Sequence, residues 1–334
     1  METQGSVKDV LPDVGNGFRL DENVRNALPA GSQVKNSVVY GTAAWTRAAR
    51  IIVEVEDGKE VSYFLKCATE NQGKLMIEGE FASLSEIAKY NPALAPKPYA
   101  HGQFKESQIP TYFILMEFLE INTGAPDPAP FCEQMAALHR DSVSPTGKFG
   151  FHITTCHGPH PQNTSWEESW SVFFSRLLRQ FFDREIDTNG PNAEYEALFK
   201  EFETVIPKIL EPLQAEGRYL KPSLIHGDLW EENTGTSLEE GSQPKIFDAA
   251  VFYAHNEYDI SMWRRDIVRF GRAHTRQYLR YMPPSEPKDQ WDDRNRLYAI
   301  KFEIAHCIGW PATSEHQRAL VTKDMKYLLS KYAD

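Results

Sequence analysis

Two apolar segments near the start of the chain flank a turn dipeptide. Residues 50–56 are rich in Ile and Val, residues 59–66 read KEVSYFLK, and Asp57-Gly58 lies between them. An Asp-Gly pair between apolar runs is a strong signal for a two-residue type I′ turn. The pattern therefore predicts a β-hairpin whose second strand ends near Lys66.

Two further patterns follow the hairpin. Residues 75–90 carry apolar side chains at intervals of three or four positions, which predicts an amphipathic helix. Residues 112–119 read YFILMEFL, a dense apolar run of strand length that predicts a buried strand. We interpret the proline-rich stretch 126–130 as a stiff link, because helical spacing dominates from there to the end of the chain.

This order of elements predicts an α+β, bilobed fold. Strands dominate residues 1–120, of which 1–35 form a weakly patterned N-terminal segment, and helices dominate residues 121–334. We expect a small antiparallel sheet with one helix in the first lobe and a larger, mainly helical second lobe. Clefts between lobes are favoured sites for small molecules.

Composition narrows the classes of partner. The 334 residues include 36 Lys plus Arg and 47 Asp plus Glu, a formal net charge of −11, which argues against a nucleic-acid-binding function. No apolar run is long enough to cross a bilayer, and the first residues lack the apolar core of a secretion signal. The four cysteines are scattered, as is typical of reduced thiols. We therefore expect a cytoplasmic protein with no membrane partner.

The segment 224–233, LIHGDLWEEN, carries the strongest chemical signal. Asp228 is placed to accept the proton of a substrate hydroxyl, and Asn233 and Asp248 offer oxygen ligands for Mg²⁺. Phosphoryl transfer needs an oriented nucleophile and metal ions that neutralise phosphate charge. The spacing H-x-D-x-x-x-x-N, followed by an apolar-apolar-Asp triplet, is that of kinase catalytic and metal loops. We therefore predict ATP and Mg²⁺ as cofactors.

A kinase also needs a lysine for the α- and β-phosphates and a glutamate that orients it. Lys66 is the candidate lysine, because it interrupts the apolar end of the predicted hairpin. At about 100° per residue, Glu80 lies at the edge of the apolar face of the predicted helix and Glu78 lies further out. We therefore choose Glu80 as the partner of Lys66.

The remaining nucleotide contacts are predicted from position alone. Gly41 and Thr42, in the loop before the hairpin, are expected to contact phosphates, although an ordinary hairpin corner remains an equal alternative. Backbone groups at Glu117, Phe118 and Leu119, which follow the buried strand, are expected to contact adenine.

Four segments together point to a known family. They are Gly150-Phe151-His152, the N-x-x-W-x-x-x-W-x-x-F-F stretch from 163 to 174, HGDLW at 226–230 and FYAHNE at 252–257. This combination resembles the fructosamine kinase (ketosamine-3-kinase) family, which belongs with the aminoglycoside and choline phosphotransferases in the protein-kinase-like fold. The resemblance implies ATP-dependent phosphorylation of the sugar 3-hydroxyl of ketoamines formed on lysine amines, which leads to protein deglycation.

The resemblance also implies site roles. Asp228 resembles the catalytic base, Asn233 and Asp248 resemble the metal ligands, and Lys66 and Glu80 resemble the ATP-orienting pair. The candidate substrate-binding residues are Trp230, His226, His255, Glu257 and Trp166. For His255 and Glu257, bracing of the catalytic loop is an open alternative, and for Trp166 the alternative is core packing. Asp259 is expected to hold the catalytic loop through backbone hydrogen bonds.

Other interpretations remain open. One is a kinase for another small hydroxyl substrate, such as an aminoglycoside or an amino alcohol, and a third hypothesis is a non-catalytic kinase-like binding protein. Four potential zinc ligands lie within nine positions at His152, Cys156, His157 and His160, but their spacing fits no common zinc site. Ribulosamines and fructosamines, free or protein-bound, are equally good candidate substrates. We expect a monomer or a weak homodimer.

Overall fold

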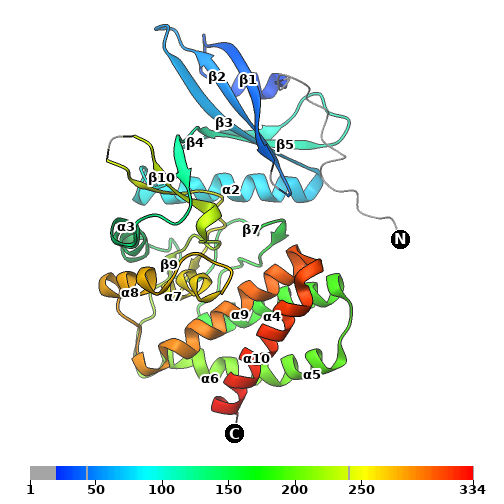
Figure 1. The fold of residues 1–334 in the computed structure, drawn as a ribbon, viewed down its shortest axis with the longest axis vertical. Coiled ribbons are helices and arrows are strands. Elements are labelled where there is room, and N and C mark those ends of the chain that lie inside the picture. Colours follow the sequence, from blue (N-terminus) through cyan, green and yellow to red (C-terminus); the bar gives the residue numbers. More distant parts are fainter. Residues whose placement is uncertain (1–19, 43, 240, 334) are drawn as a thin grey trace.

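The computed structural model describes residues 20–42, 44–239 and 241–333. They form two lobes stacked along the long axis of the molecule (Figure 1). The first lobe is a β-sheet with two helices, α1 (Glu22–Ala27) and α2 (Glu70–Tyr90). The second lobe is mainly helical, as the order of the apolar patterns predicts.

The sheet of the first lobe has five antiparallel strands in the order β1-β2-β3-β5-β4. Their bounds are β1 Gln33–Thr42, β2 Arg47–Glu54, β3 Glu60–Thr69, β4 Pro98–Gln103 and β5 Thr111–Glu117. Because side chains alternate along a strand, Leu65 and Leu115 join a small core with α1, whereas Ala68 and Ile114 pack in the core that contains α2. The central strand β3 therefore carries Lys66 on the same face as α2.

The predicted hairpin is formed by β2 and β3, but its turn differs from the prediction. The N–H of Gly58 donates to the carbonyl of Val55 (2.8 Å), and the N–H of Val55 donates to the carbonyl of Lys59 (2.9 Å), so the loop has three residues. A type I′ turn needs a positive φ at both central residues, whereas Gly58 alone in this loop has one, at +79°. Asp57 instead accepts the N–H of Lys59 through its side chain (3.0 Å).

One apolar core connects the two lobes. Leu84 and Ile87 of α2 belong to the same buried cluster as Phe131, Trp170 and Leu224 of the second lobe. α2 begins five residues before the predicted helix, and β5 ends two residues before the predicted strand end. The two lobes are therefore packed together through α2.

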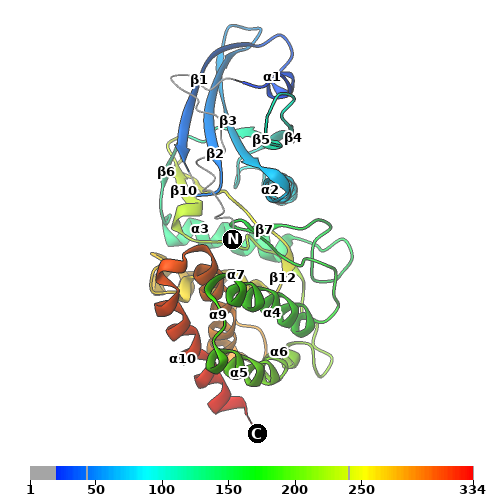
Figure 2. The ribbon, with the colours of Figure 1, turned by 90° about the vertical axis from the view of Figure 1, so that its right-hand side faces the viewer.

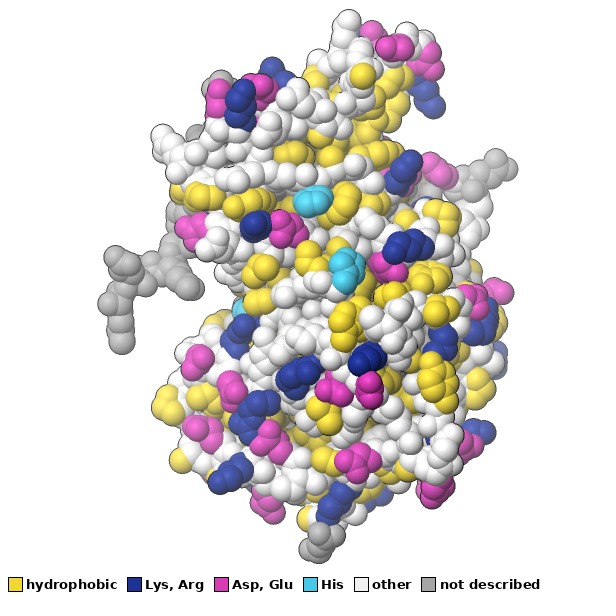
Figure 3. Space-filling view, turned by 180° about the vertical axis from the view of Figure 1, so that it is seen from behind, with side chains coloured by type: hydrophobic (Ala, Val, Ile, Leu, Met, Phe, Trp, Pro, Cys, Tyr) yellow, Lys and Arg dark blue, Asp and Glu magenta, His cyan; other side chains and the backbone are white. Residues whose placement is uncertain are grey.

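The second lobe is built from eight α-helices in the described residues. Their bounds are α3 Pro128–Asp141, α4 Trp170–Asn189, α5 Ala193–Phe202, α6 Ile206–Leu210, α7 Asn256–Ile260, α8 Arg272–Tyr281, α9 Trp291–Gly309 and α10 Ser314–Tyr332. Short 3₁₀ helices lie at Glu203–Val205, Glu211–Leu213, Glu231–Asn233, Ser261–Arg264, Lys288–Gln290 and Pro311–Thr313. Acidic and basic side chains are intermixed over the rear face of this lobe (Figure 3).

Three small sheets accompany these helices. They pair β6 (Ile121–Thr123), β10 (Thr234–Ser237) and β11 (Pro244–Ile246); β9 (Ser223–Leu224) with β12 (Tyr253–Ala254); and β7 (Cys156–His157) with β8 (His160–Pro161). Figure 2 shows β6 and β10 above α3, on the side of the molecule away from α2, and β7 and β12 below α2. These strands carry the loops that contain the predicted catalytic residues.

The proline-rich stretch 126–130 is the start of a helix and not an extended link. Pro128 occupies the first turn of α3, where a missing backbone N–H removes no helical hydrogen bond. Asp127 caps this helix by accepting the N–H of Ala129 (2.9 Å). Within the described ranges, no helix combines the length and the apolarity needed to span a bilayer.

Candidate active site

A cleft of about 780 Å³ lies between the lobes. Its walls come from the turn between β1 and β2, from β3 and α2, from residues 116–119, and from the segments around Asp228 and Asp248. The candidate residues that line it are Gly41, Lys66, Glu80, Glu117, Phe118, Leu119, Asp228, Trp230, Asn233 and Asp248. The sequence-predicted nucleotide, metal and base residues are thus brought to one place.

Lys66 lies at the centre of a buried charge cluster. Its Nζ is 2.8 Å from Oε2 of Glu80 and 2.8 Å from Oδ1 of Asp248. Burial acts to lower the pKa of Lys66, but the two carboxylates outweigh it and raise that pKa above its ordinary value. Glu78 pairs instead with Lys74 on the same helix, with 3.8 Å between Oε1 of Glu78 and Nζ of Lys74. The helical geometry of α2 therefore selects Glu80 as the partner of Lys66.

The loop around Asp228 is anchored through its backbone N–H groups, which donate to the side chain of Asp259. Asp259, on α7, accepts the N–H of His226 and the N–H of Gly227, each at 2.9 Å, and its carboxylate lies 3.1 Å from Nε2 of His139. Gly227 has a φ of +84°, and a Cβ there would lie 2.4 Å from the carbonyl oxygen of Ala250. Only glycine fits this position, and Asp259 has the loop-holding contacts that we expected.

Asp228 and Asn233 face each other across the loop. Nδ2 of Asn233 donates to Oδ2 of Asp228 (3.0 Å) and to its backbone carbonyl (2.9 Å). The side-chain oxygen of Asn233 is not engaged by these bonds. Burial raises the pKa of Asp228 to about 7, and the positive charge of Lys301 opposes this shift. The arrangement suits a base that accepts a proton in a largely dehydrated site.

Asp248 follows β11 and has an unusual backbone conformation. Its φ is +55°, in the left-handed region that costs non-glycine residues about 1–2 kcal/mol. Such strain concentrates at functional sites. Its side chain is 45% exposed, although it also contacts Lys66. Asp248 therefore presents a carboxylate to the cleft beside the position that Asn233 faces.

The turn between β1 and β2 covers one side of the cleft. Gly41 has a φ of +76°, and a Cβ there would meet no atom within 4 Å. Thr46 is buried and lines the cleft. The side chain of Thr42 lies outside the described residues. Gly41 and Thr42 are the last two residues of β1, so they form a hairpin corner rather than a separate loop. Contact of Gly41 with phosphates stays a prediction.

Three of the predicted substrate-binding residues are buried structural residues. Nε2–H of His226 donates to the carbonyl of Phe247 (3.0 Å), and the ring of His255 hydrogen-bonds the hydroxyls of Tyr298 and Ser285, both at 2.9 Å. The prediction that they bind substrate is wrong for these two histidines, because both are fully buried.

Glu257 is the third of these buried residues. It forms a buried bidentate ion pair with Arg294, at 2.8 and 3.0 Å, and accepts the N–H of Ser285 (2.7 Å). With its side chain 1% exposed, Glu257 cannot contact a substrate. The bracing alternative is the one that agrees with the structure, because α7 also carries Asp259.

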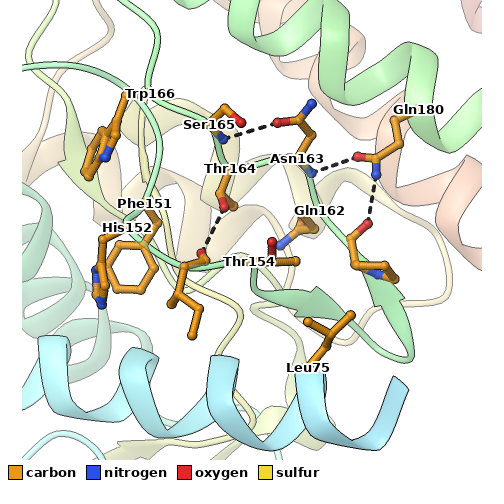
Figure 4. A pocket seen from close by; sticks show the side chains of 12 residues that line it. Leu75, Phe151, His152, Thr154, Gln162, Asn163, Thr164, Ser165, Trp166 and Gln180 are labelled. Atoms are coloured by element: carbon orange, nitrogen blue, oxygen red, sulfur yellow. Dashed lines mark hydrogen bonds between the residues drawn. The ribbon is translucent and has the colours of Figure 1, made fainter. Parts of the chain in front are cut away.

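Trp166 lies in a separate depression of about 600 Å³, between α2 and the segment 151–166. Figure 4 shows Trp166 near Phe151 and His152, with Leu75 across the depression on α2. Trp166 is not among the residues that line the cleft with Asp228. Its partly buried ring lines the separate depression instead, and substrate binding by Trp166 stays a prediction. Trp170, Phe173 and Phe174 are fully buried in the core.

Several residues of the cleft were not anticipated. Trp45 and Trp310 line it together with Trp230, and no motif marks either of them. His157 approaches the carboxylate of Asp228, with Nε2 and Oδ1 3.7 Å apart. Apart from masked positions, no group of three or more His, Cys, Asp or Glu side chains is arranged to hold a metal. The histidine cluster around His157 is thus not a zinc site within the described residues.

Comparisons with known proteins agree with this geometry. The profile of the fructosamine kinase family matches residues 33–327. A chloroplastic protein-ribulosamine 3-kinase from Oryza sativa subsp. japonica is 30% identical over 250 residues, which cover 73% of this chain and 67% of the relative. Ketosamine-3-kinase from Mus musculus is 26% identical over 265 residues, covering 73% and 81%.

Solved structures show the same fold. A Thermobifida fusca protein assigned as a fructosamine-3-kinase has a TM-score of 0.68 at 19% identity, over 90% of this chain and 95% of that one. An aminoglycoside phosphotransferase, APH(4)-Ia, has a TM-score of 0.59 at 14% identity, over 90% and 96%. The predicted α+β, protein-kinase-like fold is confirmed. The family profile covers most of the chain, and this protein belongs to the fructosamine kinase family.

Proposed function

We propose that this protein is a ketosamine 3-kinase, which transfers the γ-phosphate of ATP to the 3-hydroxyl of a ribulosamine or fructosamine. The observation that carries the proposal is the meeting of the Lys66–Glu80 pair with Asp248, Asn233 and Asp228 in one cleft. Phosphoryl transfer is catalysed by positioning and charge, and these are the groups it requires. The substrate class follows the names of the ketosamine and ribulosamine 3-kinases among the relatives.

ATP is assigned to the side of the cleft formed by the first lobe. Phe64, Met116 and Phe118 give this side an apolar lining suited to adenine. The N–H of Glu117 donates to the carbonyl of Lys97 (2.8 Å). We therefore assign the adenine edge to the carbonyl of Glu117 and the N–H of Leu119.

The phosphates are assigned to Lys66 and to the turn that contains Gly41. Glu80 holds the ammonium of Lys66 at 2.8 Å, which fixes its direction. Gly41 carries no side chain, so its backbone can approach a phosphate closely. The Lys66 ammonium would then balance part of the phosphate charge.

Mg²⁺ bound with ATP would neutralise charge on the transferred phosphate. Asn233 and Asp248 would hold it, since both line the cleft and carry a side-chain oxygen atom. Two protein ligands suffice for this ion, because Mg²⁺ usually keeps several waters and takes the rest of its ligands from substrate phosphates. The donor set therefore fits a metal that arrives with the nucleotide.

Asp228 is assigned as the base. As the sugar oxygen forms its bond to the γ-phosphorus and the bond to ADP breaks, the carboxylate of Asp228 accepts the hydroxyl proton. Trp230 follows two residues later and lines the same cleft. Its indole is placed to pack on the sugar or on the lysyl stem of the ketoamine.

The test is ADP release from MgATP with four acceptors: ribulosyl-lysine, fructosyl-lysine, an aminoglycoside and choline. We expect turnover with one or both ketoamines. Asp228→Asn should lower kcat by about 10²–10⁴-fold, whereas Asp266→Asn, at an exposed acid of the same lobe, should leave it unchanged. Turnover confined to the aminoglycoside or choline would refute the substrate class, and turnover that survives Asp228→Asn would refute the base.

The aminoglycoside alternative loses one of its supports. A polycationic substrate needs an acidic pocket, and Glu231 and Glu232 are the two acidic residues that directly follow Trp230. Glu231 is buried and accepts the backbone N–H of Arg269 (2.9 Å), so only Glu232 lines the cleft. A non-catalytic role is disfavoured because Asp228, Asn233, Asp248 and Lys66 are all present and grouped.

A further inference from the structure

Lys301, on α9, is a buried lysine that the phosphoryl-transfer machinery described above does not use. The residue is 0% exposed. Its Nζ lies 3.3 Å from Nδ1 of His157 and 3.3 Å from Oε1 of Gln162, and 4.2 Å from the centre of the Phe181 ring. Burying an ammonium group is costly unless it is paired, so its presence here calls for a partner.

The available partners exclude a simple ion pair. Among the described residues, no carboxylate lies within 4 Å of the Lys301 ammonium, and the neighbouring cation, Arg265, is paired with Glu303 at 3.1 Å. Burial lowers the pKa of Lys301 to about 7, and the charge of Asp228 acts in the opposite direction. The carboxylate to which Lys301 responds is therefore the catalytic one, with His157 between the two side chains.

The contacts determine which nitrogen of His157 carries hydrogen. Lys301 donates one N–H to Oε1 of Gln162 and, charged or neutral, keeps another for Nδ1 of His157, so we assign Nδ1 as the acceptor and the hydrogen to Nε2. Nε2 of His157 lies 3.7 Å from Oδ1 of Asp228, which is longer than a hydrogen bond, so the imidazole packs beside the carboxylate.

Gln162 orients Lys301 from the other side. Its Nε2 donates to Oγ1 of Thr155 (3.2 Å) and to the carbonyl of Ala250 (3.3 Å). These bonds direct Oε1 of Gln162 to the Lys301 ammonium. Lys301 thus donates to Oε1 of Gln162 and to Nδ1 of His157. Donation to Nδ1 agrees with the His157 tautomer that carries its hydrogen on Nε2.

We propose that Lys301 and His157 are positioning residues, which hold the carboxylate of Asp228 in the orientation needed for phosphoryl transfer. On one side Asn233 donates to Oδ2 of Asp228 (3.0 Å), and on the other side the His157 ring limits the space beside Oδ1, with 3.7 Å between Nε2 and Oδ1. The lysine acts through the histidine and touches neither substrate nor nucleotide. The inference deepens the proposed function, on which the kinetic part of its test depends.

The first experiment is independent of the substrate. In ¹⁵N-labelled protein, the imidazole signals of His157, assigned by their loss in His157→Gln, should show the Nε2–H tautomer. In Lys301→Met the same ring should lose this preference, because Nδ1 loses its donor. A pure Nδ1–H tautomer in the unaltered protein, or an unchanged tautomer in Lys301→Met, would overturn the proposal whatever the protein phosphorylates.

The second experiment measures turnover. Lys301→Met and His157→Gln should each lower kcat about 10- to 100-fold, because small displacements of a reacting group cost rates of this order, while KM for ATP stays within about twofold. The double variant should be no slower than the slower single variant, since both act through one contact. Lys323→Met, at an exposed lysine of α10, should match the unaltered protein.

The outcomes separate the two proposals. Multiplying effects in the double variant, or single variants with full kcat, would refute the positioning role. Absence of ketoamine turnover in the unaltered protein, combined with the predicted tautomer, would refute the substrate and leave the Lys301–His157 arrangement supported. If Lys301→Met does not fold, His157→Gln decides the kinetic test. Glutamine is a polar residue of similar size, which favours folding, but its amide N–H lies at a different distance from Asp228 than the imidazole N–H.

Discussion

Lys66 and Asp248 are 182 positions apart in the chain, and their Nζ and Oδ1 atoms are 2.8 Å apart. One residue belongs to the central strand of the first lobe and the other to the loop after β11 in the second lobe. Their contact closes the cleft at its centre. It also brings the predicted phosphate-binding residue beside the predicted metal ligand, as a kinase requires.

The two glutamates of α2 provide a matched pair of variants. Glu80→Gln should lower kcat/KM for ATP by about 100-fold, because the Lys66 ammonium loses the carboxylate that directs it. Glu78→Gln should have no effect, since the one ion pair of Glu78 within the described residues is with Lys74, at 3.8 Å and on the surface of α2. Steady-state kinetics with varied ATP measures both. Equal losses in the two variants would contradict the assignment of Glu80.

Metal dependence provides a second test. Excess EDTA should abolish turnover, and Asp248→Asn should raise the Mg²⁺ concentration for half-maximal activity about tenfold or more, because it removes a charged oxygen ligand. Asp266→Asn serves as the control. Activity that persists in EDTA, or an unchanged Mg²⁺ titration in Asp248→Asn, would show that Asp248 does not hold the metal.

Alanine substitutions at Gly227 and Gly147 distinguish the cost of steric crowding from the cost of a positive φ. Both have a positive φ, +84° and +70°, but a Cβ at Gly147 meets no atom within 4 Å, whereas one at Gly227 meets the Ala250 carbonyl at 2.4 Å. Gly147→Ala should cost about 1–2 kcal/mol of unfolding free energy. Gly227→Ala should cost more and also abolish turnover, as urea denaturation and kinetics will show. Equal costs would mean that the loop relaxes freely.

The lowered pKa of Asp259 leads to an expected pH dependence of the unfolding free energy. Burial acts to raise its pKa, but hydrogen bonds and charge from His139 and His226 hold that pKa below its ordinary value. A carboxylate with a lowered pKa stabilises the folded state above the pKa of the unfolded chain, near 3.9, and the stabilisation is lost as the pH falls through the folded value.

Asp259→Asn should therefore lower the unfolding free energy by about 3–5 kcal/mol at pH 7. The difference from the unaltered protein should narrow as the pH falls below about 4. Urea denaturation at pH 7, 4 and 3 measures it, with the exposed Asp266→Asn as control. A gap that stays constant or widens in acid would contradict the charged state of Asp259.

The amino-acid sequence by itself determined the order of lobes, the Lys66 and Glu80 positions and the catalytic spacing. Helical periodicity distinguishes Glu80 from Glu78 because neighbouring turns of one helix decide which face is buried. The distance of five residues from Asp228 to Asn233 likewise lies within one loop. The same local signals misplaced the start of α3, because Pro128 is compatible with both a link and a first helical turn.

Only the tertiary structure decided which polar residues face the cleft. His226, His255 and Glu257 lie in the motif segments HGDLW and FYAHNE. Their side chains are nevertheless buried, with Phe247, Tyr298 and Arg294 as partners. His157 and Lys301 are 144 positions apart, and no local pattern relates them. The identity of a buried partner depends on how distant segments pack, which the periodicity of a single segment does not contain.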